Sequence, residues 1–261
     1  MSNALNGQHS FILRLLSEQC RNAQALGELR AHFREHHYVH LPNLMTEEAF
    51  EFVKTETARL EQFALNRNFL MDGYQTPRIM KALGGEVIKS ESPLAYIYTH
   101  YEIRELIKNI VEADVHPCLH PNEFMVVNYL TFQGATHGWH LDDPSYALVI
   151  LTETTKGESG GLLEYIKDWR GICEARGVSA EETVNETVEH CRSQQIIRTH
   201  DHQAGDAYLL RADQCLHRVT ELTSKYSRRV VINMAFEATP NPTYGFTANR
   251  LYADHPADLQ L

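Results

Sequence analysis

The sequence lacks the features that mark several large classes of protein. Its 24 Lys and Arg residues are outnumbered by 34 Asp and Glu residues, and the formal net charge is −10. Binding to a nucleic-acid backbone draws on clustered Lys and Arg. No segment approaches the run of roughly 18 apolar residues that a membrane-spanning helix requires. We therefore expect neither a nucleic acid nor a membrane as a partner.

Secretion signals and paired cysteines are also missing. A secretion signal has a cationic start, then an apolar centre, then a cleavage site with small residues. Residues 1–16 do not follow this order. The cysteines are odd in number, widely spread and never in CxxC spacing: Cys20, Cys118, Cys173, Cys191 and Cys215. Neither a disulfide framework nor a zinc knuckle fits this distribution, so we expect reduced and mostly buried thiols. Together these observations predict a cytoplasmic protein.

The composition that is present fits a globular protein. Hydrophobic residues make up 43% and charged residues 22% of the 261 positions, enough for a substantial core. The chain contains no internal repeat and no low-complexity segment. The sequence therefore predicts one domain over residues 1–261. It does not determine the oligomeric state, and a homodimer is compatible with it.

The N-terminal part of the chain, residues 1–115, has the periodicity of helices. Apolar residues recur at three- and four-residue spacing at residues 10–19, 25–36, 46–64 and 94–113. Thr46 is a suitable N-cap residue, and Glu47 and Glu48 after it favour the positive end of the helix dipole. Residues 38–44 predict a short strand between two of these helices.

The period changes near residue 120. From there to residue 240, short β-branched or aromatic runs alternate with Gly, Asp and Asn, as expected for an antiparallel sandwich or barrel. The predicted strands are residues 123–132, 146–153, 160–166, 194–199, 205–212, 215–222 and 228–238. An insertion at about residues 168–193 interrupts them, and Ser179 with Glu182 forms a capping-box pattern before a surface helix. We interpret the insertion as a lid or a flank, and residues 241–261 as an irregular tail.

The segment HGWHLDDPSYALVI, residues 137–150, places two histidines and two aspartates beside an apolar run. Residues two apart on a strand face the same side, so His140 and Asp142 point one way and Leu141 the other. An imidazole and a carboxylate placed in this way suit a metal ion. The HxD pattern alone is weak evidence, because such tripeptides are common on solvated loops.

A third ligand follows further along the chain. In GDAYLLRADQCLHRVTEL a Gly-Asp turn starts one strand, and His217 lies in the next. Two histidines and one carboxylate leave half of an octahedral shell open, which is typical of non-haem Fe(II) enzymes, whereas zinc hydrolases prefer a tetrahedral set. His200 and His202 form a competing HxH pattern. They lie in a polar stretch, however, and no partner follows at matching spacing.

Two arginines open the strand RRVVINMAF after His217. A guanidinium group is the natural bidentate partner of a buried carboxylate. Strand alternation puts Arg229 and Asn233 on one face, and Arg228 with most of the apolar residues on the other. The apolar face should pack against helices. We therefore expect Arg229 and Asn233 inside the barrel, with Arg228 as the second choice for a carboxylate ligand.

Over roughly residues 120–240 these motifs resemble the Fe(II)/2-oxoglutarate-dependent dioxygenases. The resemblance implies a mainly β fold with helices: a double-stranded β-helix core of the jelly-roll or cupin type, N-terminal helices and a helical insertion. It also implies that Fe(II) is held by His140, Asp142 and His217, and that 2-oxoglutarate and O2 are the co-substrates.

The same resemblance places 2-oxoglutarate on Arg229 or Arg228. In that family a Tyr on the strand before HxD often helps to hold the co-substrate, and Asn128 and Tyr129 occupy that place here. The loop before the arginines is a residue or two longer than the commonest spacing. The choice between the two arginines therefore stays open at this point.

The stretch NEFMVVNYLTFQGATHGWHLDDPSYALVI is similar to the radical halogenases of free amino acids such as lysine, and to their hydroxylating relatives. The halogenases have Gly where this chain has Asp142, and that Gly vacates a site for chloride on iron. Because the carboxylate is present here, hydroxylation is favoured over chlorination. The resemblance places the substrate contacts at Glu123, His137, Asp143, Asn233 and Arg78.

Acids beside the metal suit an ammonium group and an arginine suits an α-carboxylate, which together describe an amino acid. The predicted function is hydroxylation of a free amino acid, a basic one such as lysine or ornithine. Two alternatives stay open. A peptide- or carrier-bound residue would be favoured by an open groove along the insertion. A non-iron jelly-roll metal protein would be favoured if the ligands did not converge.

Several of these residues also have purely structural interpretations. Asp143 precedes Pro144 and suits the start of a turn, Glu123 suits a strand-edge charge, and His137 suits a hydrogen bond to a metal ligand. The Gly160-Gly161 pair is not followed by the residues of a phosphate-binding loop. We expect that pair to let the chain pass close to the mouth of the barrel.

Overall fold

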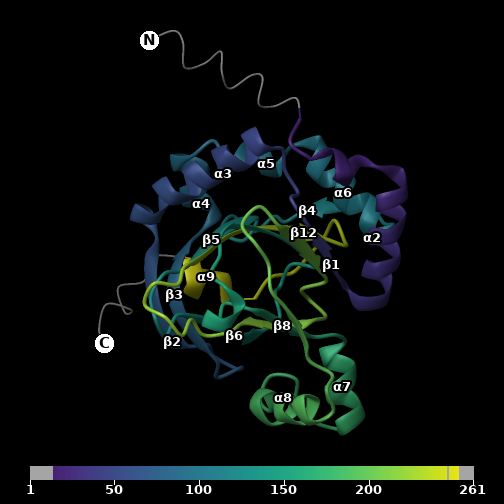
Figure 1. The fold of residues 1–261 in the computed structure, drawn as a ribbon. Coiled ribbons are helices and arrows are strands. Elements are labelled where there is room, and N and C mark those ends of the chain that lie inside the picture. Colours follow the sequence, from purple (N-terminus) through teal and green to yellow (C-terminus); the bar gives the residue numbers. More distant parts are fainter. Residues whose placement is uncertain (1–13, 246, 253–261) are drawn as a thin grey trace.

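The structure, a computed structural model, describes residues 14–245 and 247–252. Its strands form one antiparallel twelve-stranded sheet in the order β1-β10-β7-β12-β5-β3-β6-β11-β8-β9, with β2 beside β3 and β4 beside β12 (Figure 1). The bounds are β1 (Tyr38–Leu41), β2 (Leu65–Leu70), β3 (Pro77–Leu83), β4 (His116–Pro117), β5 (Met125–Leu130), β6 (Thr136–His140), β7 (Tyr146–Glu153), β8 (Leu163–Ile166), β9 (Arg198–His200), β10 (Ala207–Leu210), β11 (Leu216–Val219) and β12 (Arg229–Glu237). This arrangement confirms the predicted jelly-roll, cupin-like fold.

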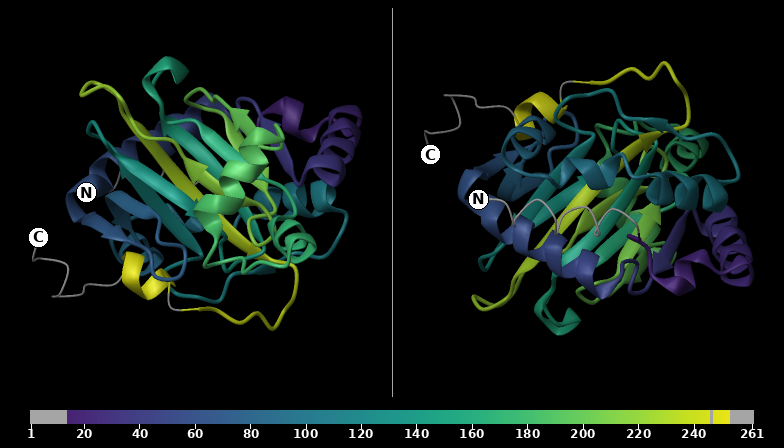
Figure 2. Two further views of the ribbon diagram at one scale, coloured as in Figure 1. Left: turned by 90° about the horizontal axis from the view of Figure 1, so that it is seen from below. Right: turned by 90° about the horizontal axis from the view of Figure 1, so that it is seen from above.

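Helices flank the sheet on two sides. The N-terminal helices lie together across one face, and the two helices of the insertion lie away from them (Figures 1 and 2). The helices are α2 (Ala23–His36), α3 (Glu47–Leu60), α4 (Gly85–Glu91), α5 (Ala95–Tyr98), α6 (Tyr101–Val111), α7 (Trp169–Arg176), α8 (Val184–Ser193) and α9 (Thr247–Tyr252), with short 3-10 turns η1 (Glu18–Arg21), η2 (Glu61–Phe63) and η3 (Gly157–Ser159). Within the described ranges, none of them combines the length and apolarity that crossing a bilayer demands.

Strand alternation divides the interior into a helix-facing core and a barrel interior. On β12, Val230, Ile232 and Met234 belong to the apolar cluster that packs against the N-terminal helices. Arg229 and Asn233 line a cavity on the other side of the same strand. The predicted alternation of this strand is therefore confirmed. Burial of the apolar side chains contributes roughly 1.5–3 kcal/mol each and leaves the opposite face free for polar chemistry.

The helix at Thr46 forms as predicted. Thr46 Oγ1 accepts a hydrogen bond from the backbone N–H of Ala49, and α3 runs from there to Leu60. The helix predicted at residues 10–19 is wrong in its described part. Leu16 instead forms a β-bridge with Met45, and only η1 is helical. The buried Glu102 carboxylate accepts the backbone N–H groups of Leu15 and Leu16, which holds this segment extended.

Two strands, β2 and β3, lie in the part of the chain expected to be mainly helical. They pair with each other along their whole length. The C-terminal part of β3 also pairs with β5, while Arg78 and Ile79 pair with β6. These partners are remote in sequence, and the ladder supplies backbone hydrogen bonds that local periodicity does not reveal. This strand connects the two halves of the sheet beside the cavity.

The insertion is helical, as predicted, but it packs against the outside of the barrel. Trp169 and Val188 share an apolar cluster with Trp139 and Leu141 of the neighbouring sheet. Ser179 Oγ accepts a hydrogen bond from the backbone N–H of Glu182, as a capping box requires. The helix α8 begins only at Val184, however, so this hydrogen bond closes a turn that precedes the helix. The insertion is therefore a flank. It supports the strands that carry the candidate metal ligands.

The tail expected to be irregular contains the helix α9. Ala248 and Leu251 are buried in the cluster formed by β2, β3 and β5. Residues 246 and 253–261 lie outside the described part. All five cysteines are free and buried, in agreement with the expectation of reduced thiols.

The Gly160-Gly161 pair provides the close approach expected of it. Gly160 has φ +81°, and a Cβ there would lie 1.8 Å from the backbone oxygen of Glu221.

We expect Gly160→Ala to lower the free energy of unfolding by about 2 kcal/mol or more, because strain and a backbone clash add. Gly134 has φ +90° with nothing within 4 Å of such a Cβ, so Gly134→Ala should cost only about 1 kcal/mol. Urea denaturation of both variants measures the difference, and equal losses would contradict the clash.

Candidate active site

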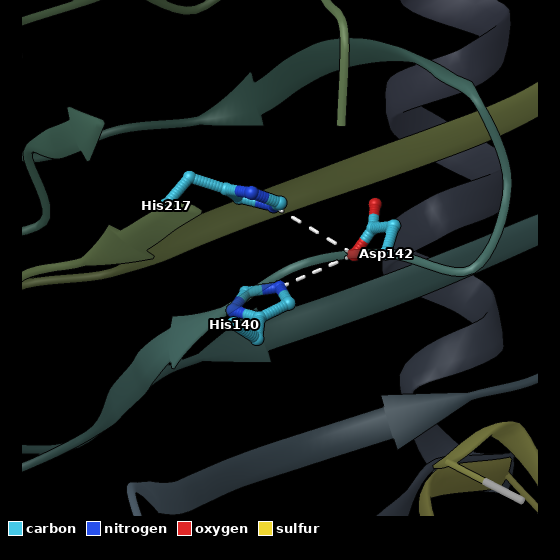
Figure 3. Close-up of side chains that lie close together, drawn as sticks. All are labelled: His140, Asp142 and His217. Carbon is cyan, nitrogen blue, oxygen red and sulfur yellow. Dashed lines mark ion pairs between the residues drawn. The ribbon is translucent and has the colours of Figure 1, made fainter. Parts of the chain in front are cut away.

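Three side chains from separate elements converge at one point in the barrel (Figure 3). His140 ends β6, Asp142 follows two residues later, and His217 lies on β11 directly opposite His140. The Nε2 atoms of His140 and His217 lie 3.4 and 3.7 Å from Asp142 Oδ1. One ligand atom from each residue lies within 4.8 Å of the others. The structure thus brings together the predicted triad in a geometry suited to one metal ion.

Backbone carbonyls fix the orientation of both imidazoles. His140 Nδ1 lies 2.8 Å from the Gly138 oxygen, and His217 Nδ1 lies 2.9 Å from the Cys215 oxygen. An Nδ1–H that donates to a carbonyl leaves the Nε2 lone pair free for a metal. Burial, followed by the neighbouring His217, lowers the pKa of His140 to about 4. This imidazole is therefore neutral at physiological pH, as a metal ligand must be.

Asp142 is placed by contacts on both sides. Its backbone N–H donates to the Ala212 oxygen at 3.1 Å, and Leu141 before it is buried in the outer cluster with Trp169. Burial raises the pKa of the carboxyl, but His217, His140 and the Arg78 guanidinium outweigh burial and hold the pKa below its usual range. The side chain is 19% exposed, toward the cavity. A charged carboxylate is thus available beside the neutral imidazole of His140 and the imidazole of His217.

A cavity opens beside the triad, and its wall combines apolar and polar residues. It is lined by Asn128, Leu130, His137, His140, Asp142, Ala147, Val149, Tyr208, Leu210, His217, Val219, Arg229, Val231, Asn233 and Tyr252. Polar groups that converge on a cavity with apolar stretches in its wall are typical of small-molecule sites.

Arg229 is the arginine that the structure places in this cavity. Its side chain is buried, and neither Nε nor Nη2 has a hydrogen-bond partner. Tyr208 on β10 lines the cavity next to it. Arg228 instead faces outward and forms ion pairs with Glu153 at 2.7 Å and Glu61 at 3.0 Å. The structure therefore separates the two arginines that the sequence left as alternatives.

Tyr129 does not reach the cavity, contrary to the prediction. Its hydroxyl donates to the Thr57 oxygen at 2.8 Å, in the core beneath α3. Asn128 lines the cavity, because neighbours on β5 face opposite sides. The tyrosine that does lie beside Arg229 is Tyr208, which the sequence analysis missed. Alternation in GDAYLLRA, with Tyr208 and Leu210 on one face, was the signal that could have identified it.

Of the predicted substrate contacts, His137 and Asn233 line the cavity, whereas Arg78, Glu123 and Asp143 are not among its lining residues. His137 stacks on His140 with ring centroids 4.1 Å apart, and Arg78 pairs with His137 in the β3–β6 ladder. Glu123 lies close enough to Asp142 and Asp143 that burial and then these two charges raise its pKa to about 9. The buried oxygen Oε2 of Glu123 has no partner.

Arg78 is completely buried. Its Nη1 donates to backbone oxygens, including that of Gly138 at 3.2 Å, while Nε and Nη2 have no partner. Burial lowers its pKa to about 10, so it stays charged at neutral pH. Arg78 and Arg229 therefore present the same empty Nε–Nη2 edge, which is the edge that binds a carboxylate through two parallel hydrogen bonds.

Two other predicted contacts occupy different positions. The Oδ1 atom of Asn233 lacks a partner and the residue lines the cavity. Asp143 accepts the backbone N–H of Gly245 at 2.7 Å, which ties the loop after β6 to the C-terminal segment. The hydrogen bond to Gly245 supports a structural role for Asp143. Its charge also contributes, after burial, to the raised pKa of Glu123.

The competing HxH pair is part of an aromatic cluster. His200 stacks on Tyr38 at 4.1 Å between ring centroids, and His202 Nε2 lies 2.8 Å from the Tyr38 hydroxyl. In the described residues, His140, Asp142 and His217 form the one group of three or more His, Cys, Asp or Glu side chains suited to a metal ion. Over residues 14–245 and 247–252, no third ligand joins the HxH pair.

Several solved structures share this fold, and among them are proteins solved with alpha ketoglutarate or 2-oxoglutarate bound. The epimerase SnoN, solved with Fe3+, alpha ketoglutarate and nogalamycin RO, is 14% identical with a TM-score of 0.61, covering 90% of this chain and 91% of its own. HygX from Streptomyces hygroscopicus, solved with nickel and 2-oxoglutarate, is 11% identical with a TM-score of 0.59 and coverages of 82% and 88%. A prolyl hydroxylase from Trichoplax adhaerens, in complex with a peptide fragment, is 12% identical with a TM-score of 0.56 and coverages of 91% and 94%.

The sequence model of the halogenase D family matches residues 21–253. The chain therefore belongs to the halogenase D family. No curated protein matches it. At the level of fold and family, these findings confirm the expectation of an oxygenase of the Fe(II)/2-oxoglutarate-dependent class.

Iron and 2-oxoglutarate fit the residues that are present. Two imidazoles and one carboxylate form the donor set expected for Fe(II) in a facial arrangement. The unpartnered Nε and Nη2 atoms of Arg229 lie in the same cavity and suit the distal carboxylate of 2-oxoglutarate. Buried donors of a guanidinium that lack a partner are costly, and a dicarboxylate ligand would remove that cost.

Proposed function

We propose that the protein is a non-haem Fe(II)/2-oxoglutarate-dependent hydroxylase of a free amino acid, a basic one such as lysine or ornithine. One observation carries the proposal. Two buried guanidinium groups on different strands, Arg78 and Arg229, present empty carboxylate-binding edges near the same candidate metal triad. One edge suits the co-substrate, and the other suits the α-carboxylate of an amino acid.

Each part of the chain has a defined task in this reaction. His140, Asp142 and His217 hold the metal, which together with 2-oxoglutarate and O2 supplies the oxidation. Arg229, with Tyr208 beside it, binds the distal carboxylate of the co-substrate and thereby sets its direction relative to the triad. The apolar residues Val149, Val231 and Leu210 limit the water around it. The protein thus orients the reactants and shields the site.

The charges around Glu123 support a basic substrate. Glu123, Asp142 and Asp143 bring three carboxyl groups together, and burial, followed by the charges of Asp143 and Asp142, raises the pKa of Glu123. An ammonium group at this position would relieve the repulsion and take up the free oxygen of Glu123. His137 and Asn233 contribute further polar atoms to the same wall, Nε2 and Oδ1, that have no partner. A free amino acid with a basic side chain satisfies both signs of charge.

The alternative of a peptide- or carrier-bound residue has less support. It was tied to an open groove along the insertion, but no residue of α7 or α8 is among those that line the cavity, and both helices pack on the outer face. The prolyl hydroxylase with its bound peptide shares the fold, which keeps this alternative open to the substrate screen. The third alternative, a non-iron jelly-roll metal protein, would be favoured if the predicted ligands did not converge. His140, Asp142 and His217 do converge. We also propose a cytoplasmic location, consistent with five free cysteines.

The experiment that tests the proposal begins with anaerobic apo-protein, Fe(II) and 2-oxoglutarate. We expect a visible metal-to-ligand charge-transfer band, and its absence would refute the iron assignment. A screen of free amino acids then follows succinate formation and a mass gain of one oxygen. Lysine or ornithine should stimulate both. Stimulation only by a peptide would support the alternative substrate class.

Asp142 determines the predicted reaction outcome. Replacement of Asp142 by Gly removes one ligand and leaves a coordination position for chloride. In high chloride with the amino acid found in the screen, we expect Asp142→Gly to form chlorinated product, detected by the chlorine isotope pattern in mass spectrometry. Asp142→Ala in chloride-free buffer is the matched control, and it should lose the charge-transfer band and form no product. Unreacted substrate with Asp142→Gly would contradict the similarity to the halogenases.

A further inference from the structure

The C-terminal helix α9 brings a tyrosine into the cavity wall from outside the barrel. Tyr252 is only 9% exposed, and it lines the cavity together with Asn128 and His137. None of the motifs around the metal ligands points to this residue, because it lies in the tail that was expected to be irregular. Its position is therefore a product of the tertiary structure alone.

Several contacts fix this tyrosine in place. Arg67 Nε on β2 donates to the backbone oxygen of Leu251 at 2.7 Å in a buried hydrogen bond. The guanidinium of Arg250 lies 4.6 Å from the ring centroid of Phe69 and pairs with Asp72. A Cβ on Gly84 would lie 2.7 Å from the Cβ of Tyr252, so the chain is closely packed against it. The protein therefore holds the ring at this point with specific interactions.

The neighbours of Tyr252 are the groups assigned above to the substrate. Tyr252 shares the cavity wall with His137, Asp142 and Asn128, and Asn128 is its hydrogen-bonding neighbour. Tyr252 and His137 line the same cavity, and Arg78 is paired with His137 in the ladder between β3 and β6. The Nε and Nη2 atoms of Arg78 lack partners, as does the buried Oδ1 atom of Asn128. A phenol beside an empty guanidinium edge adds a third N–H or O–H donor for an anion.

We propose that Tyr252 is a substrate-binding and specificity-determining residue, whose hydroxyl donates to the same substrate carboxylate that Arg78 binds. This proposal rests on the proposed amino-acid hydroxylase function. The helix α9 then closes the substrate end of the cavity, and a substrate that lacks the carboxylate loses both contacts. Arg229 and Tyr208 form an arginine–tyrosine pair on another part of the wall, so the two anionic ligands of the reaction have separate sites.

The test measures the Kd of two ligands, which differ only in one carboxylate group, for Tyr252→Phe and for the wild type. Under anaerobic conditions with Fe(II) and 2-oxoglutarate bound, L-lysine and its decarboxylated analogue 1,5-diaminopentane are titrated while the charge-transfer band is followed. A hydrogen bond to a charged group is worth about 1.5–3 kcal/mol, so Tyr252→Phe should raise the Kd of L-lysine about 10-fold or more. The Kd of the diamine should stay the same in both proteins. If another amino acid perturbs the band in place of lysine, the titration uses that amino acid and its decarboxylated analogue.

Tyr98→Phe is the matched control, because it also removes a buried tyrosine hydroxyl. Tyr98 OH donates to the Ala235 oxygen at 2.8 Å in the helix-facing core, away from the cavity. This variant should lose stability, while its Kd for L-lysine stays at the wild-type value. An equal Kd for L-lysine in Tyr252→Phe and wild type, or an equal weakening of acid and diamine, would overturn the proposal. Absence of the band in wild type, or no response to any amino acid, would instead refute the proposed function itself.

Discussion

His217→Ala is expected to abolish the charge-transfer band at concentrations of Fe(II) and 2-oxoglutarate that saturate the wild type. Removal of one imidazole leaves His140 and Asp142 as the only protein ligands of the proposed site. Loss of a partner that merely orients a ligand costs about 10- to 100-fold in metal affinity, so loss of a ligand should cost about 100-fold or more. Anaerobic titration with Fe(II), followed by absorbance, measures the change.

His200→Ala is the control for this prediction. His200 belongs to the competing HxH pair and stacks on Tyr38 outside the cavity. This variant should keep the band and the Fe(II) affinity of the wild type. If His200→Ala lost the band and His217→Ala retained it, the metal site would have to be moved to the HxH pair.

Arg229→Met is expected to have the second largest effect. The variant removes the guanidinium that we assign to the distal carboxylate of 2-oxoglutarate. Truncation of one partner of a buried, hydrogen-bonded charge pair costs about 2 kcal/mol or more, so the Kd of 2-oxoglutarate should rise about 30-fold or more. The stability of the ligand-free protein should change little, because Nε and Nη2 of Arg229 have no partner in it. The thermal shift caused by 2-oxoglutarate should therefore disappear while the Tm without ligand is retained.

Arg228→Met is the matched control on the adjacent residue of the same strand end. Its guanidinium is 41% exposed and pairs with Glu61 and Glu153 on the outside of the barrel. Exposed ion pairs are worth up to about 1 kcal/mol each, so a small loss of stability is expected. The Kd of 2-oxoglutarate should not change. A larger effect on that Kd from Arg228→Met than from Arg229→Met would reverse the assignment of the two arginines.

The separation of the two arginines illustrates what strand alternation can predict. The apolar residues Val230, Ile232 and Met234 identify the helix-facing side of β12, so the opposite side had to hold Arg229 and Asn233. The same logic applied to β10 would have identified Tyr208. The position before HxD instead points to Tyr129, which strand alternation puts beneath α3.

The N-terminal part shows where local pattern is insufficient. The spacing of apolar residues correctly predicts α2, α3 and α6, whose helices form from contacts within a few turns. For β2 and β3 the deciding contacts are ladders between each other and with β5 and β6. Such pairs contribute only when remote segments meet, so the sequence of one segment does not specify them.

By itself, the sequence determined the metal-ligand pattern, the alternation of β12 and the class of fold, because each depends on residue spacing along one or two strands. Tertiary structure alone decided which polar atoms remain without partners, that Arg78 presents the same empty edge as Arg229, and that α9 brings Tyr252 to the cavity. The physical reason is that burial and hydrogen bonding are properties of the assembled barrel. A guanidinium is available to a ligand only if no other part of the folded chain has already taken its donors.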